Sequence, residues 1–464
     1  MGREAAAWRA VAETSGAGAH PGVWELAWPT IVSNLLFSAS GFIDIKIVGS
    51  LGASAVAAIT TGTRIFFTAQ AVLMAILAGT TALVARAWGA GDRAEAARIA
   101  ELSLWLCLVV SALLTLGGTL GADALAGLFR LEPQTVALAA TFTRWLSVFY
   151  MAFAVIMALS TALRAAGDVV TPLWIGALGN VVSVFFTYSL VHGAFGLPAL
   201  GVAGAAIGNG TGFVTGAVLL TALWRSGRLV VATRAASAFR WEPIQRLIRI
   251  GYPAALEQVA WQGGFVAFLW VIALYGTAPY AAYGIGVNLL SFSFVVGFGF
   301  SIAASTVVGQ RLGAQDPEGA ARGGWHAMRL AIGVMLVFGA CIITAARPLA
   351  MFLIDDREVV RLTVAFIYVL GSVQALMAIE FSIAGALRGA GDTRFPFVTV
   401  LVGLFGVRLT LAALFAWCGL RVEWVFAALI ADYVVKATMF TMRFRSGRWA
   451  SVIREQEGAR AIRT

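Results

Sequence analysis

Four acidic residues lie inside long apolar stretches, where an ionised side chain is expensive to bury. They are Asp44, Glu257, Glu380 and Asp432. A buried carboxylate can take up a proton or bind a cation, so each of the four is a candidate functional residue. Asp44 is the strongest candidate. It lies about five residues, or roughly 8 Å along a helix, from one end of its apolar stretch, where it could exchange a proton for a positively charged molecule.

Two basic residues near Asp44 offer a different interpretation. Arg64 lies in the next apolar stretch, which a short loop brings close to the first. Lys46 lies two residues beyond Asp44 and points to another face of the helix. Arg64 is therefore the expected partner in the alternative, in which Asp44 stays ionised in a static ion pair.

The C-terminal half holds the other three buried acids. Asp432 and Lys436 have the i, i+4 spacing of a helical ion pair, and Arg408 could neutralise Glu257, Glu380 or Asp432. Three carboxylates facing one or two bases leave negative charge over, so either one acid is protonated or a bound cation completes the balance.

The coupling ion suggested by these acids is a proton or a sodium ion. Sodium would need several oxygen ligands, which Glu257, Glu380, Asp432 and nearby amides such as Gln258 could supply. We favour the proton, because it needs a single carboxylate and no dense oxygen cluster is visible in the sequence.

Metal and nucleophile chemistry finds no support. The histidines His20, His192 and His326 share no ligand spacing with one another or with cysteine. No Gly-rich phosphate loop follows a strand, so ATP hydrolysis is not expected. An integral membrane enzyme would need clustered His, Asp or Cys at a membrane surface. We therefore expect no cofactor and no enzymatic activity.

The composition indicates that lipid is the solvent of this chain. Of 464 residues, 60% are hydrophobic and 12% are charged, whereas soluble domains carry about 25% charged residues. The net charge of +10 fits loops that face anionic lipid, so no nucleic-acid partner is implied. We expect an all-α integral membrane protein with twelve crossings of about 20 apolar residues or more, at approximately 24–49, 54–84, 94–122, 135–163, 170–192, 199–224, 246–275, 280–309, 320–346, 360–386, 396–418 and 423–442.

Basic residues predict the orientation of these crossings. Of the 33 Lys and Arg residues, 23 fall on the side of the termini and seven on the opposite side, so both termini are expected in the cytoplasm. The bias toward Arg suggests a GC-rich bacterial genome, and thus the bacterial inner membrane. No cleavable leader is expected before the first crossing. The predicted segments are a cytoplasmic N-terminal tail (1–23), an N-lobe (24–224), a cytoplasmic linker (225–245), a C-lobe (246–442) and a basic cytoplasmic tail (443–464).

The chain repeats itself at a fixed offset of 224 residues. Residues 163–172 read LRAAGDVVTP, and residues 387–396 read LRGAGDTRFP. Each half holds six crossings, so both halves enter the membrane from the same side. Transporters are commonly built from such repeats, with the substrate between them near the midplane.

The repeated loop motifs have a structural interpretation. Gly lets the chain leave a helix tightly, Asp caps the next helix, and Arg faces anionic headgroups. A gating role for Arg164 and Arg388 is the alternative. Glu380 lies eight residues before Arg388 on the same helix face, so a structural link between these two is also plausible.

At four segments the sequence resembles the multidrug and toxic compound extrusion (MATE) family, in its bacterial branches. These are PTIVSNLLFSASGFIDIKIVGSLG (29–52), GYPAALE (251–257), GFGFSIAASTVVGQRLG (297–313) and LRGAGDTRFP (387–396). The resemblance implies a cation-coupled exporter of organic compounds, built as a V-shaped pair of six-helix lobes, and it associates Glu257 with ion coupling. The sequence departs from the family in three places. Many members carry an Asp four residues after an Asn on the fifth helix, whereas here Val184 stands four residues after Asn180. Lys46 stands where an uncharged residue is usual, and Arg64 stands where the family is mostly apolar.

Our hypothesis is a secondary-active multidrug efflux antiporter that works as a monomer. Protons or sodium ions enter, and amphipathic organic cations leave by alternating access. The first alternative is a flippase for lipid-linked substrates, which would line its cavity with several Arg residues. Only Arg64 and Arg408 lie well inside the spans.

Overall fold

The computed structural model describes residues 21–231 and 241–451, and all regular structure in these ranges is helical. Most of the predicted N-terminal tail with His20, residues 232–240 of the predicted linker and residues 452–464 of the predicted C-terminal tail lie outside the described residues.

The helices of the N-terminal half are α2 (Val23–Gly49), α3 (Ala53–Gly89), α4 (Arg93–Leu120), α5 (Ala122–Gly127), α6 (Pro133–Val148), α7 (Tyr150–Ala165), α8 (Val170–His192) and α9 (Val202–Arg225). Those of the C-terminal half are α10 (Trp241–Ala273), α11 (Thr277–Gly313), α12 (Pro317–Thr344), α13 (Ala346–Leu353), α14 (Arg357–Ser372), α15 (Gln374–Gly389), α16 (Arg394–Val400), a π-helical segment (Leu401–Leu409), α17 (Thr410–Trp417) and α18 (Val422–Arg445).

The membrane crossings match the expected number when bent helix pairs are counted as one. Among the described residues, ten helices are long and apolar enough to span a membrane, and the pairs α6–α7 and α14–α15 bring the total to twelve. The bends of 52° and 49° were not predicted. The first falls at Phe149, which has no Pro or Gly beside it, and the second at Val373, which directly follows Gly371 and Ser372, a pair typical of helix kinks.

The 224-residue repeat is visible in the helix bounds. Helix α3 begins at Ala53 and ends at Gly89, and α11 begins at Thr277 and ends at Gly313, so both bounds keep the offset. The two bends, at Phe149 and Val373, are also 224 residues apart. Each half therefore folds by the same plan, as the sequence repeat predicts.

Each half has its own apolar core, which makes two lobes. Phe66 of α3 stacks on Tyr150 of α7 with ring centroids 4.6 Å apart in the N-lobe, and Phe366 of α14 packs on Phe426 of α18 at 4.9 Å in the C-lobe. The start of α2 is an exception, since Val23, Leu26 and Ala27 join the core of the C-lobe.

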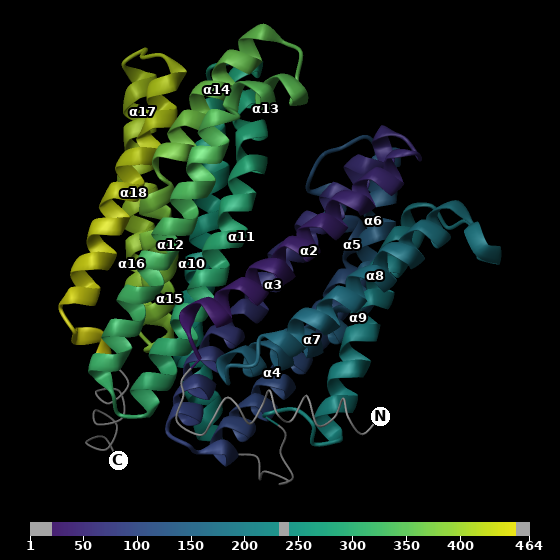
Figure 1. Cartoon of the computed structure of the whole chain (residues 1–464). Helices are drawn as coiled ribbons and strands as arrows, with labels where there is room; N and C mark the ends of the chain where they lie inside the picture. The colour runs from purple at the N-terminus through teal and green to yellow at the C-terminus, as the bar shows by residue number, and fades with distance from the viewer. Residues whose placement is uncertain (1–20, 232–240, 452–464) are drawn as a thin grey trace.

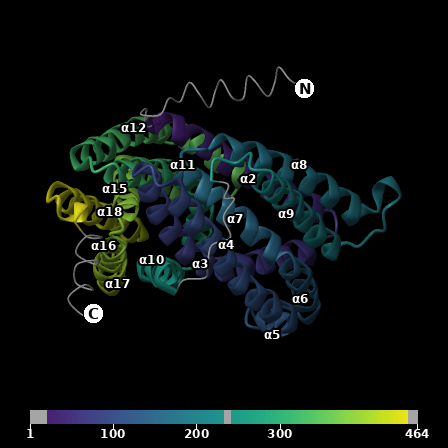
Figure 2. The ribbon, with the colours of Figure 1, turned by 90° about the horizontal axis from the view of Figure 1, so that it is seen from below.

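The two lobes meet at one end and diverge at the other (Figure 1). The end where they meet carries the start of α2 and the end of α18, and we call it the inner end; the opposite end is the outer end. Viewed from below, α2, α3, α10 and α11 lie at the junction between the lobes (Figure 2).

Helices α3 and α11 approach each other closely at the inner end. A Cβ atom on Gly89 would collide with the backbone of Gln310, and one on Gly313 would collide with the backbone of Arg86. These two contacts are related by the 224 offset, so the pseudo-two-fold axis passes between the helices. The Gln310 side chain also donates a 2.9 Å hydrogen bond to the carbonyl of Ala165 on α7, which joins the lobes further.

The repeated loop aspartates cap the helices that follow them, as predicted. Asp92 accepts a 2.9 Å hydrogen bond from the Glu95 amide at the start of α4, and Asp316 accepts one of 2.7 Å from the Gly319 amide at the start of α12. The hydrogen bond from Gly319 holds the pKa of Asp316 below its ordinary value.

Candidate functional site

Asp44 is buried inside the N-lobe, where α2 packs against α8 and α9. Its side chain faces Thr187 of α8 and Asn209 of α9, and the residue is 6% exposed. Carboxylate atom Oδ1 has no hydrogen-bond partner, and within residues 21–231 and 241–451 no basic group lies within ion-pair distance of this acid. The alternative of a static ion pair with Arg64 is not observed, since Arg64 lies on an exposed face of α3.

Small residues explain why polar side chains reach Asp44. Gly212 of α9 packs against the carbonyl of Gly179 on α8, and Gly208 packs against the backbone of Thr187. This close packing brings Asn209 beside α8, where its Oδ1 accepts a 3.3 Å hydrogen bond from the Ser183 hydroxyl. A larger residue at either glycine would separate the two helices.

Thr187 and Asn209 were not predicted from the sequence. The Gly-rich pattern of residues 202–225 was the available signal, because it marks a helix that packs closely on its neighbour. Asn180, which was a candidate, lies half-buried on α8 about two turns before Thr187. Val184 occupies the same helix face between them, so an apolar side chain separates Asn180 from the polar group at Asp44.

Glu257 of α10 forms an ion pair with Arg388 of α15. The distance between Glu257 Oε1 and the Arg388 guanidinium is 2.5 Å, and Arg388 also donates a 3.4 Å hydrogen bond to the Ser301 hydroxyl. The sequence had suggested Glu380 as the partner of Arg388, because the two share a helix face. That pairing is wrong, since Glu380 binds a different base. Gln258, the neighbour of Glu257, is half-buried.

A second cluster lies deep in the C-lobe. Asp432 of α18 pairs with Arg408 of the π-helical segment and, at 3.3 Å, with Lys436, so the predicted i, i+4 pair is confirmed. Lys436 also lies 3.3 Å from Glu380 Oε1 on α15. All four residues are almost fully buried. The ammonium of Lys436 further lies 4.7 Å from the ring centroid of Trp261.

A glycine makes room for this cluster. A Cβ atom on Gly403 would lie 2.6 Å from Cγ of Lys436 and would also collide with Asp432. Gly403 belongs to the π-helical segment that carries Arg408. Such local widening of a helix is frequent at functional sites, and the segment carries the buried Arg408.

The charge balance of the C-lobe differs from the expected one. The three acids Glu257, Glu380 and Asp432 face the three bases Arg388, Arg408 and Lys436. The expectation of surplus negative charge was wrong because it left out Arg388. The three acids also do not meet in one place, since Glu257 binds Arg388 about two turns of α15, or roughly 12 Å, from Glu380.

The part of the chain that the structure describes contains no group of three or more His, Cys, Asp or Glu side chains that could hold a metal ion. The three acids proposed as sodium ligands each have a basic partner at 3.3 Å or less. Asp44 is thus the buried acid of the candidate set whose charge no base neutralises.

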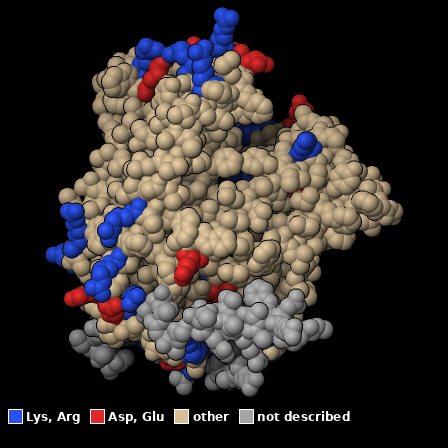
Figure 3. All heavy atoms as spheres, viewed as in Figure 1, with Lys and Arg blue, Asp and Glu red and all other residues tan. Residues whose placement is uncertain are grey.

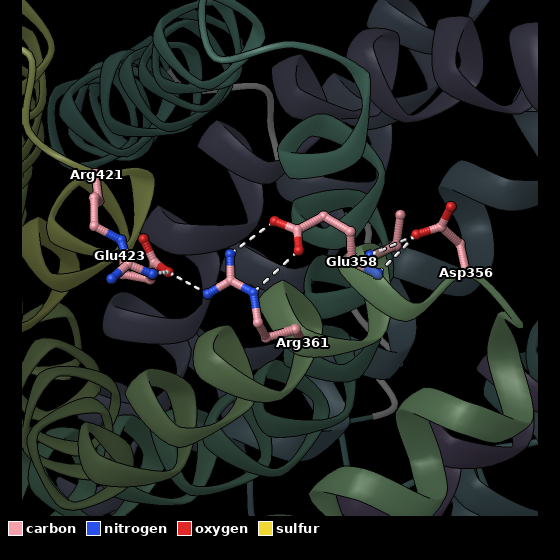
Figure 4. A network of polar contacts seen from close by, with 6 residues as sticks. Asp356, Glu358, Arg361, Arg421 and Glu423 are labelled. Carbon is pink, nitrogen blue, oxygen red and sulfur yellow. Dashed lines mark hydrogen bonds and ion pairs between the residues drawn. The ribbon is translucent and has the colours of Figure 1, made fainter.

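An exposed network lies at the outer end of the C-lobe and was not predicted (Figure 4). Arg361 of α14 contacts Glu358 and Glu423, both at 2.7 Å, and Arg421 contacts Glu423 at 2.7 Å. The Asp356 carboxylate caps α14 through the amides of Glu358 and Val359. Exposed ion pairs contribute little free energy, so this network adds little to the packing of α14 against α18.

Comparisons with known proteins agree on the family. The family model described as MatE matches residues 29–189 and 253–414, two segments that begin 224 residues apart. The chain is 28% identical over 432 residues to the probable multidrug resistance protein NorM of Thermotoga maritima, and the match covers 92% of each chain.

Solved structures of similar fold support the same architecture. A MOP superfamily transporter from Pyrococcus furiosus, described as having a binding pocket of reverse polarity, matches with a TM-score of 0.86 and 18% identity, over 92% of this chain and 95% of that one. An outward-facing multidrug resistance MATE family transporter matches with a TM-score of 0.85 and 19% identity, over 92% and 96% of the two chains.

Proposed function

Because the chain belongs to the MATE family, we propose that it exports amphipathic small molecules in exchange for protons, with Asp44 as the proton carrier. Relatives called multidrug resistance proteins support the export of small molecules. We choose protons over sodium ions because the acids proposed as sodium ligands are each neutralised by a base. The observation that carries the proposal is that Asp44 is buried without a basic partner, whereas Glu257, Glu380 and Asp432 are each paired.

A buried carboxylate without a partner binds a proton more readily than one in water. A proton bound at Asp44 removes a charge from the contact of α2 with α8 and α9. Release of that proton restores a charge that favours a positively charged group of the substrate. Proton and substrate then compete for one site, which is the condition for exchange.

The lobe junction supports a cycle of alternating access. The lobes are in contact at the inner end through α3 and α11 and diverge at the outer end, which corresponds to an outward-open state. Binding shifts the equilibrium between the outward-open and inward-open states only by its differential affinity for the two. The charge state of Asp44 supplies such a difference, because α2 contributes to both lobes.

We assign the inner end to the cytoplasm of a bacterial cell and the helices to its inner membrane. The excess of basic residues on this side supports the assignment. Substrate then leaves the cleft on the outer side, and protons enter from there.

The experiment is the substitution Asp44→Asn in purified protein reconstituted into liposomes. Asparagine keeps the size of the side chain and its hydrogen bonding but cannot ionise. We expect the variant to lose accumulation of a cationic dye against its gradient when a pH gradient is imposed. Asp123→Asn is the matched control, because Asp123 is an exposed acid of the same lobe that pairs with Arg144 at 2.6 Å.

A second measurement separates loss of coupling from loss of folding. Dye exchange at equal concentration on both sides needs no ion gradient, so folded Asp44→Asn should retain this exchange, at a reduced rate because the charge that favours the cationic dye is lost. Accumulation by Asp44→Asn at the rate of the unchanged protein would disprove the role of Asp44.

A further inference from the structure

Two basic side chains are exposed on the spanning helices of the N-lobe, Arg64 well inside its helix and Lys46 near a helix end. Arg64 lies 11 residues beyond the start of α3, roughly 16 Å along the helix, and Lys46 lies in the last turn of α2. Both are exposed, and neither has an ion-pair partner within residues 21–231 and 241–451. The export cycle proposed above uses neither.

Their positions assign these side chains to the cleft between the lobes, Arg64 by its depth in the helix and Lys46 by its neighbours on α2. An ionised side chain at this depth points to protein or to water, because hydrocarbon contact is too costly. Lys46 is one turn beyond Phe42, whose ring stacks on Phe292 of α11 in the other lobe at 6.3 Å. A space-filling view shows Lys or Arg atoms inside the hollow between the lobes (Figure 3).

The wall contributed by the C-lobe is polar but uncharged. The 224 offset makes Asn288 of α11 the counterpart of Arg64, and Asn288 is exposed. Gln262 of α10 is exposed as well. The repeat therefore carries a charge on one wall of the cleft and amides on the other.

Away from their inner ends, the helices around this cleft bury their acidic side chains. On α2, α3, α10 and α11 the described acids away from the inner helix ends are Asp44 and Glu257, and each is 6% exposed. Glu257 is also neutralised by Arg388. A molecule in the cleft therefore meets positive exposed charge on these helices. Of their described acids, Asp44 is the one that is buried without a basic partner.

We propose that this cleft selects amphiphiles that carry an acidic group, a carboxylate or a phosphate, in addition to a basic group. Arg64 binds the acidic group with support from Lys46, and the basic group lies toward Asp44. This inference rests on the proposed export function and specifies its substrate class. It modifies the expectation of simple organic cations, which would meet Arg64 with like charge.

The chemistry of Arg64 suits this role. A guanidinium presents a planar fork of N–H donors that matches a carboxylate or phosphate, and such charge-assisted bonds are about twice as strong as neutral ones. Exposed aromatic rings on the same helices, Phe37, Phe42 and Phe67, supply an apolar surface for the body of the molecule. Phe37 and Phe67 already contact each other edge to face at 6.4 Å.

Two dyes of one scaffold test the inference. Rhodamine 110 carries a free carboxyl group, and rhodamine 123 is its methyl ester, so the pair differs only in the acidic group. Binding is measured by fluorescence anisotropy with the full chain in detergent and no ion gradient. We expect the unchanged protein to bind rhodamine 110 about tenfold more tightly than rhodamine 123, the ratio that one charge-assisted contact supplies.

Variants assign the preference to Arg64. Arg64→Gln should abolish the preference for rhodamine 110 while leaving binding of rhodamine 123 unchanged or tighter. Arg64→Lys should retain part of the preference, and Arg144→Gln, at an exposed ion pair with Asp123, should retain all of it. Retained binding of rhodamine 123 shows that Arg64→Gln is folded.

Two results would overturn the inference in different ways. Equal binding of the two dyes, or a preference that survives Arg64→Gln, would overturn the selection of acidic groups and leave the export function standing. Failure of both dyes to bind the unchanged protein would overturn the inference together with the proposed export of amphiphiles.

Discussion

Removal of Lys436 tests the charge balance inside the C-lobe. Lys436 lies 3.3 Å from both Glu380 and Asp432, and it is fully buried. Lys436→Met keeps the length of the side chain but leaves two acids facing Arg408 alone. The cluster then carries one uncompensated negative charge in a medium that solvates it poorly.

The magnitude follows from the loss of one partner in a buried ion pair, about 3–5 kcal/mol of unfolding free energy. A second change should recover part of it. In Lys436→Met/Glu380→Gln, Asp432 and Arg408 remain as a neutral pair, so the double variant should be about 1–3 kcal/mol more stable than the sum of the single effects. Lys46→Met, at an exposed lysine, should change stability by at most about 0.5 kcal/mol.

The assay is denaturant unfolding in mixed micelles, followed by tryptophan fluorescence, for the unchanged protein and these variants. Additive effects of Lys436→Met and Glu380→Gln would refute the neutral-cluster argument. So would a Lys436→Met variant as stable as the unchanged protein, because the remaining acids would then have another source of compensation.

Four further predictions concern the lobe junction, two helix caps and the topology. Gly89→Val should open the inner end, because its side chain collides with the backbone of Gln310; spin labels at exposed positions 94 and 318 should then show longer distances, whereas Gly333→Val, which has open space, should not change them. Asp92→Ala should destabilise the protein by about 1 kcal/mol through loss of its cap. The lowered pKa of Asp316 stabilises the protein above the ordinary pKa of Asp and loses that effect as the pH falls through the lowered value, so Asp316→Ala should flatten the acid limb of the stability profile. Reporter fusions near residue 235 and at the C-terminus should both report cytoplasm, and a periplasmic signal from either would contradict the topology.

The sequence predicted the fold in detail because lipid imposes simple rules. Apolar length sets the crossings, and the 224 offset sets the plan of two lobes. The bends at Phe149 and Val373 escaped prediction, because hydrophobicity reports burial and not the direction of a helix axis. The Gly371–Ser372 pair before Val373 was an available signal, whereas no Pro or Gly marks Phe149.

The candidate residues were predicted better than their partners. Asp44, Glu257, Glu380 and Asp432 stand out because charges in apolar stretches are rare. Helix spacing identified the pair of Asp432 with Lys436, since both lie on one helix. Pairs between helices, such as Glu257 with Arg388, depend on how helices are placed in space, and one sequence does not specify this.

Neutral residues are the least visible in the sequence. Thr187 and Asn209 gained significance only when the close packing of α8 and α9 placed them at Asp44. The same holds for the polarity of the cleft. Whether Arg64 is exposed or paired depends on which face of α3 it occupies relative to Asp44.

The most direct test of proton coupling at Asp44 is transport by the reconstituted protein under separately imposed gradients. A pH gradient without sodium should drive accumulation of a cationic dye, and a sodium gradient at equal pH should not. Asp44→Asn should remove the response to pH while retaining exchange at equal concentration. Transport that strictly requires sodium would contradict the account, because Glu257, Glu380 and Asp432 are all neutralised by bases.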